Sequence, residues 1–107
     1  MVNQGDILIL SFNSQLGREQ KGVRPAIVLS NSKFHKYFPQ MAIVCPITTT
    51  DRNWGSHVKL PDSLKTTGFV MCEQLKLVDL KSRKKQFVEH ATDDFVDKIL
   101  NIIKMFF

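Results

Sequence analysis

A loop between two apolar runs concentrates residue types that bind phosphate groups. Residues 17–25 read Gly-Arg-Glu-Gln-Lys-Gly-Val-Arg-Pro, so two glycines bracket cations, a carboxylate and an amide. Glycine lets the backbone approach a ligand closely, and the side chains between the glycines project from a surface loop. Arg24 precedes Pro25, which biases it toward an extended conformation. A guanidinium fixed at the start of a strand suits phosphate, and the competing interpretation is a solvated hairpin loop.

A second polar loop, residues 48–55, contains the only tryptophan and ends in glycine. Such a segment after an apolar run is a candidate functional loop. Trp54 either stacks an unpaired base or packs the loop against the domain. Thr48 is one of three consecutive threonines, and an ordinary strand-end threonine is the competing interpretation. His57, in Ser-His-Val, fits a hydrogen-bonded structural histidine at the start of a strand.

Length and charge bound the class of protein. A chain of 107 residues forms one domain, here residues 1–107. The formal net charge of +5 favours a polyanionic partner. Cations gather in residues 76–85, whereas Asp93, Asp94 and Asp97 gather near the C-terminus. We therefore expect one basic face and a C-terminal helix outside it.

Several classes of site and location are not indicated by the sequence. No window approaches eighteen uninterrupted apolar residues and no basic-then-apolar leader opens the chain, so we expect a cytoplasmic protein without a membrane partner. Cys45 and Cys72 stand singly in apolar runs, which indicates buried reduced thiols. No carboxylate cluster or histidine pair has metal-ligand spacing, so we expect neither metal nor cofactor.

Short β-branched runs without helical period predict about six or seven strands. They fall at residues 7–12, 23–29, 41–47, 57–61, 68–72, 75–79 and 86–89. Pro46 indicates an edge strand or a bulge, because proline cannot donate to a ladder. Residues 34–39 fit one helical turn, with His35 at the surface. Such a pattern predicts a small, curved antiparallel domain, either barrel or sandwich.

The apolar period changes after Ala91. Phe95, Val96, Ile99, Leu100 and Ile103 fall on one helical stripe, with Thr92 as a candidate N-cap. The pattern predicts a C-terminal helix. The terminal aromatic residues 106–107 then pack on the domain or on a partner.

Four short motifs in register resemble the MazF/PemK family of toxin endoribonucleases. The first is Gly5-Asp6 followed by the loop Gly17-x-Glu19-Gln20-x-Gly22-x-Arg24-Pro25, and the other three are Ile47-Thr48-Thr49, Ser56-His57-Val58 and Glu73-Gln74-Leu75. The resemblance covers nearly the whole chain. It implies a mainly β fold with a C-terminal helix, namely a small SH3-like barrel of the MazF/CcdB/PemK kind that forms a homodimer.

The resemblance implies metal-independent cleavage of single-stranded mRNA by attack of the 2′-hydroxyl on the adjacent phosphorus. It makes Arg24 and Thr48 the catalytic pair, with misregistration to Thr49 as the alternative. Guanidinium stays protonated in proteins, so Arg24 is assigned to charge stabilisation. The proton acceptor is left open between Glu19 and His57. Further expected RNA-binding residues are Arg18, Gln20, Lys21, Thr49, Arg52, Trp54, His57, Glu73 and Gln74. Residues 51–55 depart from the family pattern, so no particular cleaved sequence is implied.

The resemblance also implies partners. These are a cognate acidic MazE-like antitoxin, and operator DNA bound only through the antitoxin complex. We expect the antitoxin to pair with Arg18, Lys21 or the cations of residues 81–85, and the dimer to use Ile99, Ile103 and Phe107. Two other functions compete: a CcdB-like toxin that poisons a topoisomerase, and a noncatalytic nucleic-acid-binding SH3-like module.

Overall fold

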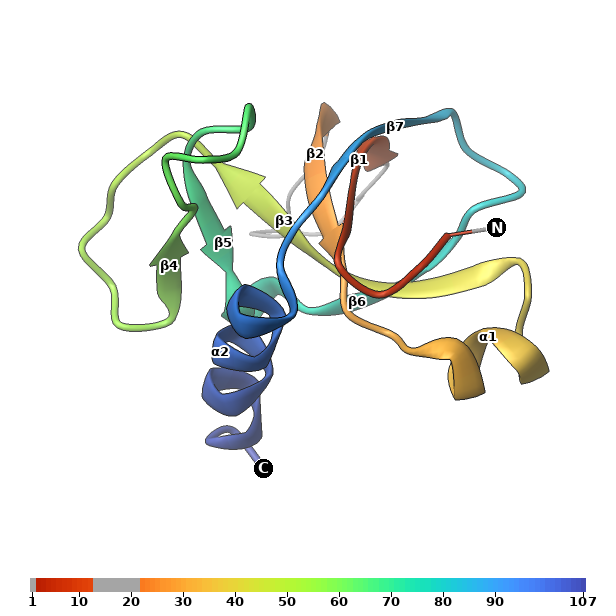
Figure 1. The fold of residues 1–107 in the computed structure, drawn as a ribbon. Helices are drawn as coiled ribbons and strands as arrows, with labels where there is room; N and C mark the ends of the chain where they lie inside the picture. The colour runs from red at the N-terminus through yellow and green to blue at the C-terminus, as the bar shows by residue number, and fades with distance from the viewer. Residues whose placement is uncertain (1, 13–21) are drawn as a thin grey trace.

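The computed structural model describes residues 2–12 and 22–107 (Figure 1). Its elements in chain order are β1 (Asp6–Phe12), β2 (Gly22–Val28), α1 (Ser32–Tyr37), β3 (Met41–Thr48), β4 (His57–Lys59), β5 (Phe69–Met71), the 3₁₀ helix η1 (Cys72–Gln74), β6 (Lys76–Asp79), β7 (Lys85–His90) and α2 (Asp93–Lys104). The predicted strands and the predicted C-terminal helix are all present in this order. Within these residues no helix has the length and apolarity needed to span a membrane.

The strands form one antiparallel sheet in the order β4-β5-β3-β2-β1-β7, and β6 pairs with β3 outside this path. Strand β3 organises the arrangement because it has three partners. One edge pairs with β2, while the other edge pairs first with β6 and then with β5. Figure 1 shows β3 crossing the molecule between these partners, with β4 and β5 on one side and β6 on the other. The backbone ladder does not close into a ring, but the curved all-antiparallel sheet with a C-terminal helix confirms the predicted class.

The sheet is buried on both faces by two apolar clusters. The first, which we call the main core, lies under α2 and includes Ile27, Ile47, Val70 and Ile99. The second core lies on the other face, among β1, β2, β3 and β6. Burial on both faces explains why the strands of the sequence appeared as continuous apolar runs rather than as an alternation.

Helix α2 begins where its sequence predicts. The Thr92 side chain accepts a hydrogen bond from the amide of Phe95, as an N-cap does. Ile99 and Ile103 are buried in the main core. The expectation that these two side chains form a dimer interface is therefore wrong, because the domain itself already covers them. Phe107 remains 96% exposed at the terminus.

Two local expectations are also corrected. Pro46 lies in the central strand β3, between Val44, the last residue to pair with β6, and Ile47, the first to pair with β5. The ladder on that edge changes partner at this point, so a missing N–H is tolerated there. His35 is buried rather than at the surface, and its Nε2 lies 2.6 Å from Ser30 Oγ.

A side chain joins the two ends of the strand order. Glu89 on β7 accepts hydrogen bonds from the amides of Lys65 and Thr66 and from the Thr66 hydroxyl, at 2.6–3.0 Å. Lys65 and Thr66 belong to the connection between β4 and β5, at the opposite end of the sheet order. The Glu89 carboxylate therefore spans the opening that the backbone ladder leaves.

Candidate active site

A row of side chains crosses five strands at one end of the sheet. Leu10 on β1 pairs with Arg24 on β2, and Thr48 on β3 pairs with Phe69 on β5, which in turn pairs with Lys59 on β4. Strands β2 and β3 join these two groups. Ala26 pairs with Pro46, and extending this antiparallel register by two residues places Arg24 opposite Thr48. We call these five residues the cross-strand row.

The row faces away from α2. Ile47, Val58 and Val70 lie in the main core beneath α2, and neighbouring residues on a strand point to opposite faces of the sheet. Thr48, Lys59 and Phe69 therefore point to the other face, together with Leu10 of the second core. The row crosses the border of that core, so its polar groups lie on the same face as the buried Leu10.

Arg24 and Thr48 keep hydrogen-bonding capacity in this setting. The Arg24 side chain is half-buried, and its Nε is buried without a partner among the described residues. The Thr48 residue is 9% exposed, and its Oγ1 accepts a bond of 3.2 Å from the amide of Thr50. That bond uses an acceptor site of the hydroxyl and leaves its hydrogen to donate. A buried donor without a partner is costly, so Arg24 Nε favours an acceptor from outside the described residues, either from the chain itself or from a ligand.

The backbone of Thr48 is held closely by Gly68, which precedes β5. A Cβ atom at position 68 would lie 2.3 Å from the Thr48 carbonyl oxygen, and the φ angle of Gly68 is +124°. Only glycine permits both the close approach and this backbone conformation. Gly68 therefore fixes the position of the strand end that carries Thr48.

A second polar cluster lies where β4 begins and β5 ends, two residues along β4 from Lys59. Glu73 on η1 accepts hydrogen bonds of 2.7 Å from Ser56 Oγ and from His57 Nε2, one on each carboxylate oxygen. Burial acts to raise the pKa of Glu73, but the bonds from Ser56 and His57 outweigh it, so the pKa lies below its usual range. The ionised carboxylate only accepts, which places a hydrogen on His57 Nε2. His57 Nδ1 is buried and has no partner among the described residues.

Trp54 extends this cluster to the surface. Its ring centroid lies 5.0 Å from that of His57, and the Arg52 guanidinium lies 5.6 Å from the Trp54 ring. Asn53, at φ +56°, turns the loop, and its amide donates to Asp51 Oδ1. Trp54 is 52% exposed, so its indole is not used to plug the core and lies partly at the surface.

The sequence matches a family model for PemK-like, MazF-like toxins of type II toxin–antitoxin systems over residues 3–107. The chain belongs to this family. A curated relative, Endoribonuclease PemK of Escherichia coli, is 27% identical over 103 residues, which cover 92% of this chain and 77% of the relative. The crystal structure of MazF (Form-I) from Deinococcus radiodurans superposes with a TM-score of 0.89 at 27% identity and covers 98% of this chain and 94% of that one. The MazE–MazF complex (Form-II) from the same organism gives a TM-score of 0.83 at 27% identity, with the same coverage.

The structure of this PemK/MazF-like toxin divides the predicted site residues into groups. Arg24 and Thr48 lie together in the cross-strand row, and Thr49 is exposed just beyond it. Arg52, Trp54, His57 and Glu73 form the second cluster, and Gln74 is partly buried on η1. Arg18, Glu19, Gln20 and Lys21 lie outside the described residues.

Phe69 and Lys59 lie in the cross-strand row and Gly68 lies against Thr48, and none of the three was predicted as a site residue from the sequence. Phe69 and Gly68 appeared only as members of an apolar run, and Lys59 as the polar position of an alternating strand. The alternation of residues 57–61 shows that Lys59 leaves the core face, but the neighbour of Lys59 depends on strand register. That information is absent from the local pattern.

The cysteines of the toxin take no part in this site. Cys45 and Cys72 are buried free thiols, and Cys45 Sγ lies 3.9 Å from the carbonyl oxygen of Cys72. Burial raises the pKa of the Cys72 thiol to about 11 and raises that of Cys45 as well. Both are therefore protonated near neutral pH, and the prediction of buried reduced thiols is confirmed. Among the residues that the structure describes, no group of three His, Cys, Asp or Glu side chains is placed to hold a metal ion.

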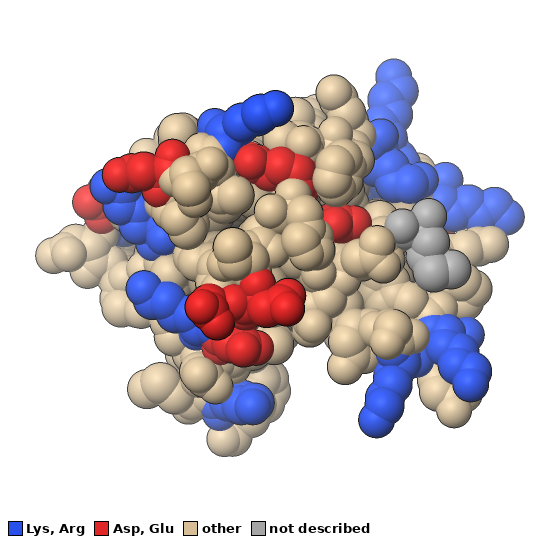
Figure 2. Space-filling model, viewed as in Figure 1, with Lys and Arg blue, Asp and Glu red and all other residues tan. Residues whose placement is uncertain are grey.

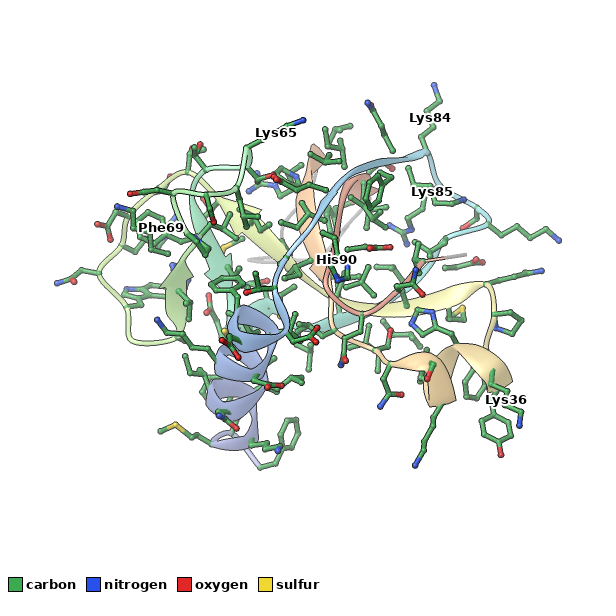
Figure 3. The ribbon with its side chains drawn as sticks, in the orientation of Figure 1. Lys36, Lys65, Phe69, Lys84, Lys85 and His90 are labelled. Carbon is green, nitrogen blue, oxygen red and sulfur yellow. The ribbon has the colours of Figure 1, made fainter. Side chains whose placement is uncertain are left out.

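Charge is unevenly spread over the toxin's surface. Figure 2 shows acidic side chains over α2 with some Lys or Arg side chains beside them, and a further group of Lys or Arg side chains without acidic neighbours projecting at the opposite side, where α1 and the β6–β7 connection lie. Lys36, Lys84 and Lys85 are labelled at that side in Figure 3. This distribution agrees with the expectation of a basic face away from the C-terminal helix.

Proposed function

We propose that this chain is the toxin of a type II toxin–antitoxin pair and an endoribonuclease that cleaves single-stranded RNA without a metal ion. The observation that carries the proposal is the cross-strand row, in which the continued β2–β3 register sets Arg24 beside Thr48. The PemK relative, named as an endoribonuclease, supports the activity. Cleavage by RNA's own 2′-hydroxyl explains why no ligand set for a metal is needed.

The reaction forms a bond between the 2′-oxygen and phosphorus and breaks the bond from phosphorus to the 5′-oxygen. Negative charge develops on the phosphate oxygens in between, and preorganised donors aimed at that charge lower the barrier. The Arg24 guanidinium and the Thr48 hydroxyl act as these donors. Arginine's planar fork holds two phosphate oxygens at once, and its permanent charge needs no proton exchange during the reaction.

The 2′-hydroxyl proton must pass to a base, and the leaving 5′-oxygen must receive a proton. His57 is poorly placed for the first step, because its Nε2 is bound to Glu73 and its Nδ1 is buried. His57 also lies on β4, two strands from Thr48, which is roughly 10 Å across the sheet. Glu19 is therefore our assignment for the proton acceptor.

Other residues bind the RNA on either side of the reacting phosphate. Trp54 contacts His57 and Arg52 and is 52% exposed, and we assign an unpaired base to stack on the exposed part of its ring. Glu73 holds the strand start that carries His57, and through it orients Trp54. The remaining RNA contacts are assigned to Arg18, Gln20, Lys21, Thr49 and Gln74.

The partner that silences the toxin is an acidic antitoxin segment, as the MazE–MazF complex of the structural relative suggests. Such a segment pays an ordering cost on binding, so it needs apolar anchors as well as ion pairs. A hollow of about 330 Å³ lined by Pro39, Leu80, Lys81 and Lys85, together with Val2 and Gln40, offers both. The toxin acts in the cytoplasm as a homodimer, and it binds operator DNA only within the antitoxin complex.

Incubation of purified protein with labelled single-stranded RNA in EDTA tests the proposal. We expect discrete cleavage products in the presence of the chelator. Cleavage that requires Mg²⁺ contradicts the metal-independent mechanism. RNA binding without cleavage identifies the noncatalytic module, and inhibition of a topoisomerase by a protein inert toward RNA identifies the CcdB-like alternative.

A further inference from the structure

Phe69 occupies a position in the cross-strand row that the apolar packing of the domain does not explain. It is the first residue of β5, and its neighbours across the strands are Thr48 on β3 and Lys59 on β4. Its neighbour in sequence, Val70, is fully buried in the main core, so the Phe69 ring points to the opposite face. Figure 3 labels Phe69 on this part of the sheet.

The Phe69 side chain is partly exposed and belongs to neither apolar cluster formed by the described residues. Among those residues, the partly buried apolar side chains packed on the main core are Leu64, Leu75, Val88, Leu100 and Ile102, and Val2 packs on the second core. Lys59 beside it is exposed, with its ammonium group on the same face. Directly opposed residues in an antiparallel pair have Cβ atoms about 5 Å apart. The ring therefore lies one strand from the Thr48 hydroxyl and one strand from the Lys59 ammonium group.

We propose that Phe69 and Lys59 form a nucleotide subsite next to Arg24 and Thr48, in which the base beside the cleaved bond stacks on the Phe69 ring and its phosphate pairs with Lys59. This inference rests on the proposed function. It extends the binding surface along β5 and β4, in a direction separate from the Trp54 loop.

The chemistry of the row fits one RNA strand lying across it. From Arg24 to Lys59 the row spans three strand spacings, about 14 Å. It has a cation at each end, a hydroxyl group and an aromatic ring between them, and no acidic side chain. An aromatic ring stacks any base, because every base has a π face, and a single lysine next to it adds a phosphate contact.

The test separates RNA binding from cleavage. Binding of a short, fully 2′-O-methylated single-stranded RNA, which cannot react, is measured by fluorescence anisotropy, and kcat and KM are measured with labelled cleavable RNA. Phe69→Leu keeps apolar bulk but removes the ring, and Phe69→Trp restores a ring. Phe87→Ala on β7 removes a phenylalanine that is 59% exposed and lies at the far end of the sheet order, so it is the matched control.

We expect Phe69→Leu to weaken binding and raise KM about tenfold or more, since stacking contributes roughly that much per base. The change in kcat is expected to be smaller. Phe69→Trp should bind like the wild type, and Phe87→Ala should change neither parameter. Lys59→Ala should weaken binding and reduce its salt dependence, whereas Lys98→Ala on α2 should not.

Three results overturn the subsite. The first is unchanged RNA binding by a folded Phe69→Leu protein. The second is a loss of RNA binding in Phe87→Ala as large as that in Phe69→Leu. The third is dissociation of Phe69→Leu into monomers in light scattering, which would assign the ring to contact between two copies. Failure of the proposed function gives a different result from failure of the subsite. If the wild-type protein cleaves no RNA but binds the methylated RNA in a way that depends on Phe69, the subsite is supported and the nuclease activity is not.

Discussion

At the scale of single residues, Arg24 combines a fixed position in β2 with a buried Nε that has no partner among the residues the structure describes. Arg24→Ala should lower kcat by on the order of 10² or more, as the loss of one transition-state donor does in other enzymes. Arg24→Lys should also be strongly impaired, because a point charge does not reproduce the planar fork. Single-turnover cleavage of labelled RNA measures both variants.

Lys98→Ala is the matched control for Arg24, because it removes one exposed cation from α2. It should cleave like the wild type. Circular dichroism and thermal unfolding check that the Arg24 variants are folded. A folded Arg24→Ala protein with near wild-type kcat would remove Arg24 from the mechanism.

The threonine pair gives a second prediction at this scale. Thr48 lies in the cross-strand row and Thr49 is exposed beyond the end of β3. Thr48→Val, which keeps the shape but removes the hydroxyl, should lower kcat by on the order of 10², and Thr48→Ser should recover most of the rate. Thr49→Val should lower kcat much less. The reverse order in a cleavage assay would transfer the catalytic role to Thr49.

At the scale of elements, the contact of Gly68 with the end of β3 predicts a local destabilisation. Gly68→Ala places a Cβ atom against the Thr48 carbonyl oxygen and strains a backbone at φ +124°. Strain of this kind costs roughly 1–3 kcal/mol of the free energy of unfolding. The displacement should also reduce kcat, because it moves the residue that carries the hydroxyl. Urea unfolding and cleavage rates measure the two effects.

Gly55→Ala is the control for this substitution, since a Cβ atom there meets nothing within 4 Å. It should leave the urea midpoint nearly unchanged. If Gly68→Ala and Gly55→Ala have equal midpoints, the contact with Thr48 does not contribute to stability.

Elements with a strong local signal were predictable, and their pairing was not. The 3.6-residue period and the Thr92 cap defined α2, and the apolar runs defined the strands. The prediction that Pro46 marks an edge strand or a bulge was wrong, because proline is tolerated within β3 at the point where the pairing partner of β3 changes from β6 to β5. The prediction that His35 lies at the surface was wrong, because the local sequence does not show that His35 is buried beside the Ser30 hydroxyl.

The candidate site shows the same division. Arg24 and Thr48 were found through motifs shared with a family, which carry positional information that one sequence lacks. Phe69 and Lys59 have no motif, and their place beside Thr48 follows only from the β3–β5 and β4–β5 registers. Long-range pairing of this kind cannot be read from periodicity, because a one-residue slip reverses the face of every side chain.

At the scale of the whole molecule, the Glu89 bridge predicts a pH-dependent stability. Burial acts to raise the pKa of Glu89, but the bonds from Thr66 and Lys65 outweigh it, so the pKa lies below its ordinary value. A lowered pKa adds stability above the unfolded value of about 4.3. That contribution is lost as the pH falls through the lower folded value. Urea midpoints between neutral pH and about pH 3 should therefore fall less steeply for Glu89→Gln than for the wild type.

The comparison needs a control for removal of negative charge. Asp97→Asn removes an exposed carboxylate from α2, an element that contributes no group to the Glu89 bridge. Its midpoints should fall with pH as those of the wild type do. Parallel curves for the wild type and Glu89→Gln would show that the bridge contributes nothing to the folded state.

The cross-strand row also has a consequence for how the toxin comes into being. Its members stand between positions 10 and 69 and come from five strands, and the carboxylate that closes the sheet follows at position 89. Pairings between residues so distant in sequence form late and slowly compared with local structure. At the usual ribosomal rate, synthesis of the 107 residues takes roughly 5–20 s. The growing chain thus contains Arg24 well before the other strands place its neighbours beside it. An antitoxin synthesised during that interval encounters a toxin whose active site has not yet formed.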